Sequence, residues 1–380
     1  MKKVFILAGE LSGDKTAGWY LGKITLRSLD EARDRRDERG ERDKNVVYEA
    51  IGGDHLVAAG AKIYQRFEVL NIVGLIEIIK HLRFIFRFLN QITNYIIQNN
   101  FDEVILVDFP GFNLRLAKKL KKKNPDIKIT YLSPPQLWIW GVGRIKKLKK
   151  YCDDLIVLYP FEVSWYEKRG INARYLGNPV YDELKDYFEL AEKKENKIVI
   201  LPGSRKSEIK KLLPIFISAV NRFSLANSRI ELYLPLAESI DTHNIQKQLR
   251  KLKMVQINII KGEKEKLKIL SSSCLAFSKP GTTTLQLALL KVPTIVVYKT
   301  SWLTYFMARL LVHVKFMSLP NLFLNHEMFK ELIQFGCNSN NISTHLNSLY
   351  DSCMKKDERY EKLQNDFCKI REIFSSHHLS

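Results

Sequence analysis

A chain of 380 residues is too long for one small core and predicts two domains. Its hydrophobic fraction of 46% is that of a globular protein. No run of about 18 uncharged apolar residues occurs, which argues against a transmembrane helix. The net charge of +20 indicates a polyanionic neighbour, for which nucleic acid, anionic lipid and a phosphorylated substrate all qualify. The five cysteines form no CxxC pair, so we expect neither a metal nor a disulfide framework and favour a reducing cytoplasm.

The first half of the chain alternates apolar strands with helical segments. The expected strands are Val4–Ala8, Val47–Gly52, Glu103–Val107, Lys128–Leu132 and Asp154–Leu158. This alternation predicts a doubly wound α/β domain with a parallel sheet, in which functional groups lie beyond the carboxyl ends of the strands. The turn Gly9–Gly13 and Asp108 both satisfy that rule. The charged run Leu29–Asn45 indicates a solvated helix end or loop.

One segment of the first half, Asn71–Asn99, is unusually apolar and is interleaved with cations. Its apolar residues include Ile72, Ile79, Phe84 and Phe88, and its cations include Lys80, Arg83 and Arg87. A wide apolar surface edged by positive charge suits a helix lying in a membrane interface. A helix buried between domains fits the same pattern, so both interpretations stay open.

The second half repeats the alternation and predicts a second Rossmann-like domain. Its expected strands are Ile198–Leu201, Ile230–Leu234, Val255–Ile260, Leu275–Ser278 and Thr294–Tyr298. The predicted domains are residues 1–180 and 181–345, linked by a polar helix over Asp182–Asn196. Residues 346–380 are expected to form a C-terminal helix that packs back on the first domain or on a partner.

Two turns of the second half have the character of phosphate sites. Lys197–Glu208 and Ala276–Gln286 each run from an apolar strand through a small-residue turn into a helix-forming sequence. The free N–H groups and the dipole at a helix N-terminus favour an anion. Ordinary strand–helix turns have the same sequence pattern. Arg205, which follows Gly203-Ser204, favours a phosphate site, because a guanidinium matches the geometry of a phosphate group.

A nucleoside triphosphate site is not expected at the other glycine turn. Gly9–Thr16 superficially resembles a P-loop, but three residues rather than four separate the glycines. Asp14 also precedes the lysine, where its charge would repel phosphate.

The same turn begins a series of motifs that runs in order along nearly the whole chain. The series is Ala8–Asp14 (AGELSGD), Gly52-Gly53, Val73–Glu77, Val107–Asn113 (VDFPGFN), Ser133–Trp140 (SPPQLWIW), Pro160–Glu162, Leu201–Glu208 (LPGSRKSE), Gly281–Leu285 (GTTTL), Ser318–Leu322 (SLPNL) and Glu331–Gln334. This series resembles the lipid-A-disaccharide synthase family.

The resemblance implies a GT-B type glycosyltransferase, with two Rossmann-like domains facing a cleft. Such an enzyme joins UDP-2,3-diacylglucosamine to 2,3-diacylglucosamine 1-phosphate (lipid X) and releases UDP. It implies a peripheral protein on the cytoplasmic face of the inner membrane, a homodimer, and no nucleic-acid partner. Three positions depart from the family pattern: Gly111 replaces an Asp, Asn178 a His and Gln286 a Glu.

The resemblance also assigns roles to individual residues. Inverting transfer needs a base for the acceptor hydroxyl and a stabiliser for the departing diphosphate. Asp108 matches the base, although a helix N-cap has the same pattern. Glu10 and Ser12 would border the acceptor or position the base, although a turn whose polar groups bond to one another fits the same residues. The residues expected to bind UDP, with neither a metal nor a cofactor, are Gly203, Ser204, Arg205, Gly281, Thr282, Thr283, Gln286 and Asn321.

Two rival functions stay open at this point. The first is another GT-B UDP-sugar transferase or a UDP-sugar epimerase. The second is a basic membrane- or nucleic-acid-binding relative with weakened catalysis. The three departures favour this second function, whereas the retained Asp108 and Arg205 argue against it.

Overall fold

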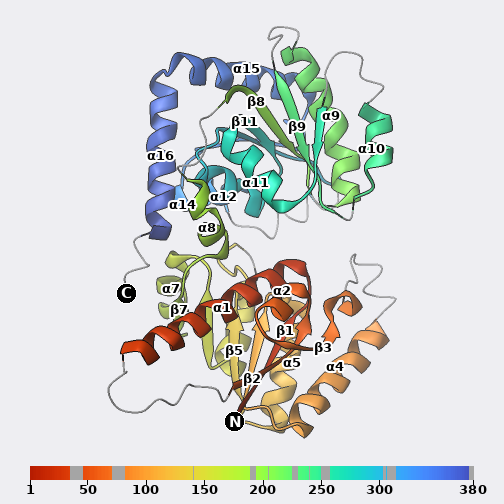
Figure 1. Ribbon diagram of the computed structural model, residues 1–380, viewed down its shortest axis with the longest axis vertical. Helices are drawn as coiled ribbons and strands as arrows, with labels where there is room; N and C mark the ends of the chain where they lie inside the picture. The colour runs from red at the N-terminus through yellow and green to blue at the C-terminus, as the bar shows by residue number, and fades with distance from the viewer. Residues whose placement is uncertain are drawn as a thin grey trace. The chain divides into compact units, whose positions relative to one another are not determined.

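The protein is described by a computed structural model (Figure 1). The residues described are 1–34, 46–70, 82–139, 141–188, 194–203, 205–224, 230–238, 240–249, 257–302, 305 and 314–375. They form two compact units, residues 1–179 and 180–380. Within the described residues no helix is long and apolar enough to cross a bilayer.

The first unit is built on a parallel sheet of seven described strands in the order β3-β2-β1-β4-β5-β6-β7. Its elements are β1 (Lys2–Ala8), α1 (Leu11–Asp34), β2 (Val46–Gly52), α2 (Asp54–Ala58), β3 (Lys62–Arg66), η1 (Phe67–Leu70), α4 (Leu82–Gln98), β4 (Glu103–Val107), α5 (Pro110–Lys123), β5 (Lys128–Leu132), η2 (Val142–Arg144), α6 (Ile145–Tyr151), β6 (Asp154–Val157), α7 (Pro160–Glu167) and β7 (Ala173–Tyr175). The order reverses between β1 and β4, which makes this the topological switch point of the sheet.

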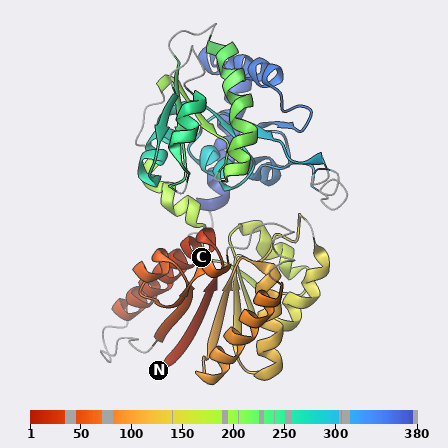
Figure 2. The same cartoon turned by 90° about the vertical axis from the view of Figure 1, so that its right-hand side faces the viewer.

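The alternation of side chains along β1 explains why helices cover both faces of this sheet. Val4 and Ile6 point into a core completed by α1 and α2. Phe5 and Leu7 point into the opposite core, which α4 and α5 complete. Figure 2 shows the red α1 on one side of the strands and the orange α4 on the other. Since both faces are covered, the central strand β4 is buried along its whole length, as strands of parallel sheets commonly are.

The second unit repeats the plan with six described parallel strands in the order β10-β9-β8-β11-β12-β13. Its elements are α8 (Pro179–Leu184), η3 (Lys185–Tyr187), β8 (Lys194–Leu201), α9 (Lys206–Ser224), β9 (Glu231–Pro235), α10 (Thr242–Leu249), β10 (Ile257–Ile260), α11 (Glu263–Ser272), β11 (Ser273–Ser278), α12 (Thr282–Leu289), β12 (Thr294–Tyr298), α14 (Leu319–Leu324), β13 (Lys330–Ile333), α15 (Ser339–Lys355) and α16 (Glu358–Ser375). Here the strand order reverses between β8 and β11.

Two expectations about the elements of this unit need correction. The polar segment after Asp182 is not one helix to Asn196, because β8 already begins at Lys194. The C-terminal tail comprises two helices, α15 and α16, which break at Lys356 in the left-handed conformation (φ 51°). Within its own unit, α16 packs on α12, α14 and α15. Its packing on the first unit or on a partner stays a prediction.

Candidate functional site

In the first unit the predicted site residues follow the carboxyl ends of three adjacent strands. Gly9 follows β1, Asp108 follows β4 and Ser133 follows β5. The turns are packed closely: a Cβ on Gly9 would lie 2.9 Å from the ring of Phe109. The switch point between β1 and β4 therefore brings Asp108 next to the Gly9–Gly13 turn.

The backbone at Asp108 has an uncommon conformation that several buried side chains support. Asp108 and Phe109 both have positive φ, 47° and 44°, which costs energy in residues other than glycine. The hydroxyl of Tyr131 donates to the Asp108 carbonyl oxygen at 2.6 Å, and Asn113 Nδ2 donates to the same oxygen at 2.8 Å. Tyr131 and Asn113 are fully buried. This conformation ends β4 sharply and sets the direction of the Asp108 side chain.

The carboxyl group of Asp108 has the environment of a group that exchanges protons near neutral pH. Burial raises its pKa from 3.8 to about 6, and the nearby charge of Glu10 adds to the rise. The hydroxyl of Ser133 opposes it by donating to Asp108 Oδ1 at 2.6 Å. Such a carboxylate is more basic than an exposed one, which suits a general base. No helix-capping bond from Asp108 accompanies the start of α5, where Phe109 occupies the N-cap position.

The other residues of the AGELSGD turn divide into two groups. Glu10 and Ser12 are exposed, and the Ser12 hydroxyl donates to Glu10 Oε1 at 2.9 Å. Asp14 is fully buried, and its carboxylate accepts the N–H groups of Gly53 at 2.6 Å and His55 at 3.0 Å. Asp14 therefore holds the start of α2. A structural role for this family residue was not anticipated.

In the second unit the two phosphate-type turns lie side by side. β8 and β11 pair in parallel with Leu201 opposite Ser278, so both strands end at the same level. Gly203 and Gly281 follow them with φ of 121° and 144°, values that favour glycine. The turns lead into α9 and α12, whose first N–H groups have no intrahelical partners.

The predicted UDP-binding residues at these turns differ in access. Arg205, Gly281 and Thr282 are exposed and Thr283 is half-buried. Ser204 lies outside the described residues. Gln286 is buried in α12, with 5% of its surface exposed. An anion at the turns would therefore meet a guanidinium and the N-terminus of α12.

The side chain of Asn321 is occupied by hydrogen bonds within the protein. It is fully buried; its Nδ2 donates to the Phe329 carbonyl at 2.8 Å and to Glu331 Oε1 at 2.9 Å, and its Oδ1 accepts the Phe329 N–H at 2.8 Å. Glu331 also accepts bonds from Ser318. Asn321 thus joins the SLPNL turn to β13, which indicates support of the site from within.

Two of the departures from the family pattern have clear surroundings. A Cβ on Gly111, in the first turn of α5, would meet no atom within 4 Å, so the missing aspartate would fit. Asn178 is buried, and its Nδ2 donates to the Leu158 carbonyl at 2.9 Å.

Helix α4 corrects part of the predicted membrane surface. Phe88 is buried with Leu89 and Ile92 in the core of the first unit, because residues four apart share one helix face. Its assignment to a membrane surface was therefore wrong. Phe84 and Phe86, by contrast, are 39% and 48% exposed. Ile72, Ile79 and Lys80 lie outside the described residues.

A buried acid in the Pro160–Glu162 motif was not predicted from the sequence. Glu162 accepts the indole N–H of Trp138 at 2.9 Å and the backbone N–H of Tyr159 at 3.2 Å. Burial raises its pKa to about 7. Phe161 lies against Trp138 with ring centroids 5.1 Å apart. Glu162 therefore joins the loops that follow β5 and β6.

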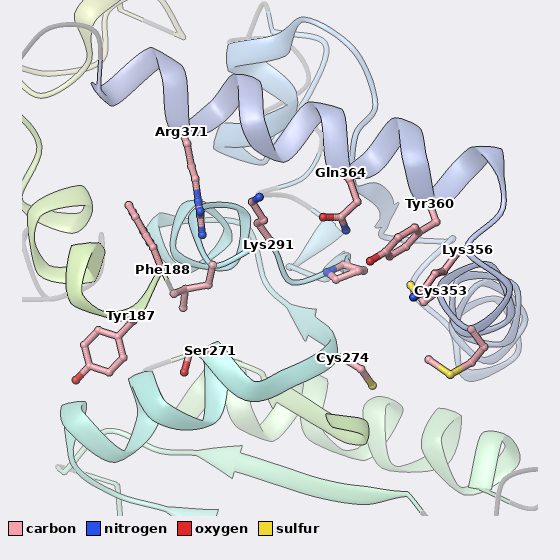
Figure 3. A pocket seen from close by; sticks show the side chains of 13 residues that line it. Tyr187, Phe188, Ser271, Cys274, Lys291, Cys353, Lys356, Tyr360, Gln364 and Arg371 are labelled. Atoms are coloured by element: carbon pink, nitrogen blue, oxygen red, sulfur yellow. The ribbon is translucent and has the colours of Figure 1, made fainter. Parts of the chain in front are cut away.

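A cavity of about 390 Å3 lies at the end of the second sheet where the strands begin (Figure 3). Cys274 at the start of β11 and Pro293 before β12 line it, so it is remote from the phosphate-type turns of this unit. In Figure 3 Arg371 and Gln364 project from α16 toward Lys291. The Arg371 Nε donates to the Leu289 carbonyl at 2.8 Å, which ties α16 to the end of α12.

Comparison with known proteins assigns the family. The model of the lipid-A-disaccharide synthetase family matches residues 4–377. The lipid-A-disaccharide synthase of Rickettsia typhi is 32% identical over 379 residues, covering 98% of this chain and 95% of that protein. The chain belongs to the lipid-A-disaccharide synthase family. It is accordingly a glycosyltransferase of lipid A biosynthesis.

Solved structures support the GT-B fold. The Staphylococcus aureus MnaA structure with UDP has a TM-score of 0.60 at 14% identity, covering 98% of this chain and 92% of that one. MurG of Acinetobacter baumannii has a TM-score of 0.51 at 12% identity, covering 99% of this chain and all of the other. At such identities the likeness concerns the fold alone. Both parallel sheets agree with the two doubly wound domains predicted from the sequence.

Proposed function

We propose that Asp108 is the general base of this lipid-A-disaccharide synthase and that the first unit binds the acceptor, lipid X. The Asp108 carboxylate would accept the proton of the acceptor 6-hydroxyl as its oxygen attacks the anomeric carbon of the donor. The bond to UDP then breaks with inversion, giving the β-1,6 disaccharide. The observation that carries this proposal is the environment of Asp108: a pKa of about 6 at a switch point, beside a glycine turn.

Glu10 and Ser12 are proposed to border the acceptor. Both are exposed beside Asp108, and the charge of Glu10 raises the Asp108 pKa. A neighbouring carboxylate disfavours the charged form of the base, so the base holds the transferred proton more strongly.

The second unit is proposed to bind the UDP of the donor at the turns after β8 and β11. Arg205 and the N–H groups of Gly281, Thr282 and Thr283 would neutralise the diphosphate without a metal. Gln286 is proposed to bind a ribose hydroxyl. The S. aureus relative in fold, MnaA, was solved with UDP, which agrees with this proposal. Asn321 would act by holding the nearby turn.

Membrane association is proposed to involve the start of α4. Phe84 and Phe86 are exposed there beside the exposed cations Arg83 and Arg87. Exposed rings edged by cations suit an anionic bilayer surface, from which acylated substrates would be drawn. A homodimer on the cytoplasmic face of the inner membrane completes the proposal, and its subunit number can be measured by light scattering.

The function is tested by incubating purified protein with UDP-2,3-diacylglucosamine and lipid X and identifying the disaccharide by mass spectrometry. Asp108→Asn keeps the shape of the side chain and suits positive φ. It should lower turnover by roughly 10²-fold or more. Asp126→Asn, on an exposed residue before β5, is the control. Wild-type turnover in Asp108→Asn would remove this residue from the mechanism, and absence of disaccharide with wild-type protein would overturn the proposed reaction.

A further inference from the structure

An ion pair joins the two phosphate-type turns of the second unit. Lys279 Nζ lies 2.6 Å from Glu208 Oε1, although the residues are 71 positions apart. Lys279 is the first residue after β11, and its N–H donates to the Leu201 carbonyl at the end of β8 at 3.2 Å. Glu208 lies in the first turn of α9. The ammonium is therefore fixed at the switch point of this sheet.

The Lys279 side chain passes directly over the glycine of the first turn. A Cβ on Gly203 would lie 2.9 Å from Lys279 Cδ and 2.2 Å from Glu208 Oε2. A side chain at this position would displace both of them. The lysine thus approaches the Gly203–Arg205 turn from the neighbouring strand, at the place proposed for diphosphate.

The ion pair leaves the lysine capable of holding an anion. An ammonium has three N–H donors, and the bond to Glu208 uses one of them. The Lys279 side chain is 27% exposed, so solvent and solutes reach it. Glu208 Oε2 independently accepts the Arg205 N–H at 3.3 Å, as a carboxylate does in the first turn of a helix. Glu208 therefore stays satisfied if Lys279 turns toward a ligand.

We propose that Lys279 is a diphosphate-binding residue, held ready by Glu208, and that it contacts the phosphate which becomes the terminal group of the departing UDP. This inference rests on the proposed UDP site. A cation there would neutralise charge that develops on the leaving group, as fixed cations do in phosphate chemistry. A purely structural clip between two turns is the competing explanation.

The two explanations predict different outcomes for Glu208→Gln when it is compared with Lys279→Met. If Lys279 binds diphosphate, Lys279→Met removes a charge-assisted bond and lowers UDP affinity by roughly 10-fold or more. Glu208→Gln removes a competing carboxylate while keeping an acceptor for the Arg205 N–H, so UDP affinity is retained or rises. If the pair is only a clip, both substitutions weaken UDP binding alike.

The test is calorimetric titration of the full-length protein with UDP, UMP and uridine. Lys279→Met should lose most affinity for UDP, less for UMP and none for uridine, while Lys279→Arg should stay near wild type. Lys266→Met, in an ion pair with Glu263 on α11, is the matched control. Equal losses for all three ligands, or a loss in Glu208→Gln matching that in Lys279→Met, would overturn the inference.

Two further outcomes are separable. Wild-type protein that binds no UDP would overturn the proposed donor site and this inference together, whereas unchanged UDP affinity in Lys279→Met overturns the inference alone. If Lys279→Met does not fold, the sign of the change in Glu208→Gln still decides.

Discussion

The hydroxyl of Ser133 donates a hydrogen bond to Asp108 Oδ1 at 2.6 Å. The two residues end neighbouring strands, and each has positive φ. The bond favours the charged form of the carboxyl group and so opposes the effect of burial. Ser133 thus keeps the base deprotonated at neutral pH, and the same bond fixes the carboxylate in one direction.

The proposed base makes transfer dependent on pH. Because the folded-state pKa of Asp108 is about 6, kcat/KM should rise through pH 6 and level off above it. The raised pKa of Asp108 also affects the free energy of unfolding. The folded protein binds this proton more strongly than the unfolded chain does, so the group stabilises the fold at low pH, and that contribution is lost as the pH rises from 3.8 to about 6. A rate profile of the wild-type enzyme between pH 5 and 8, under conditions where it stays folded, measures the first effect.

Removing the Ser133 hydroxyl should shift that profile. Ser133→Ala leaves burial and Glu10 to act on Asp108 alone, so the midpoint should move above pH 6 and the rate at neutral pH should fall. Glu162→Gln is the control, because Glu162 has a pKa of about 7 and lies after β6, the strand next to β5. If the midpoint moves with Glu162→Gln and not with Ser133→Ala, Glu162 rather than Asp108 governs the profile.

Arg205→Ala should weaken UDP binding and slow transfer, since a charge-assisted bond to phosphate is lost. A chelator should leave the wild-type rate unchanged if Arg205 and helix N-termini supply the neutralising charge. Titration with UDP and rate measurements with and without chelator check both expectations. A rate abolished by chelator and restored by magnesium would contradict the proposed metal independence.

Gln286→Glu should have two opposing effects. A charged acceptor binds a hydroxyl more strongly than an amide by about 1 kcal/mol, so UDP affinity should rise up to several-fold. The position is buried, so the charge should lower the stability of the unliganded protein. Calorimetry with UDP and denaturant unfolding without it measure the two quantities. An unchanged or lower UDP affinity would remove Gln286 from the ribose position.

The exposed and the buried rings of α4 should respond differently to the same substitution. Phe84→Ser combined with Phe86→Ser should reduce binding to anionic liposomes and activity on long-chain substrates, with a smaller loss of stability than Phe88→Ser, since Phe84 stacks on Phe88 but is itself 39% exposed. Phe88→Ser should instead lower the free energy of unfolding by roughly 3 kcal/mol or more, because a core ring is lost. Liposome sedimentation and denaturant unfolding separate the two. Unchanged liposome binding in the double variant would remove this surface from the proposal.

The sequence predicted both sheets because their central strands are continuous apolar runs bounded by turn residues. It also predicted the position of Asp108, since residues after a central strand meet at the switch point. The contacts of Ser133 and Lys279 could not be predicted from the sequence, because each contact joins segments that are far apart in the chain and meet only when their strands pair. Phe88 was misassigned because the composition of this segment shows that it is apolar but not which of its side chains are buried. The break at Lys356 carries no glycine or proline to mark it.

The capping of α2 by Asp14 affects how loss-of-function variants should be interpreted. Asp14→Ala leaves three backbone N–H groups near the start of α2 without their acceptor, at Gly53, His55 and Leu56. Buried donors without partners cost about 1–3 kcal/mol each, which is enough to lower protein abundance in a cell several-fold. In a growth-complementation assay this variant would resemble a catalytic mutant. Only activity normalised to the amount of folded enzyme would distinguish Asp14 from Asp108.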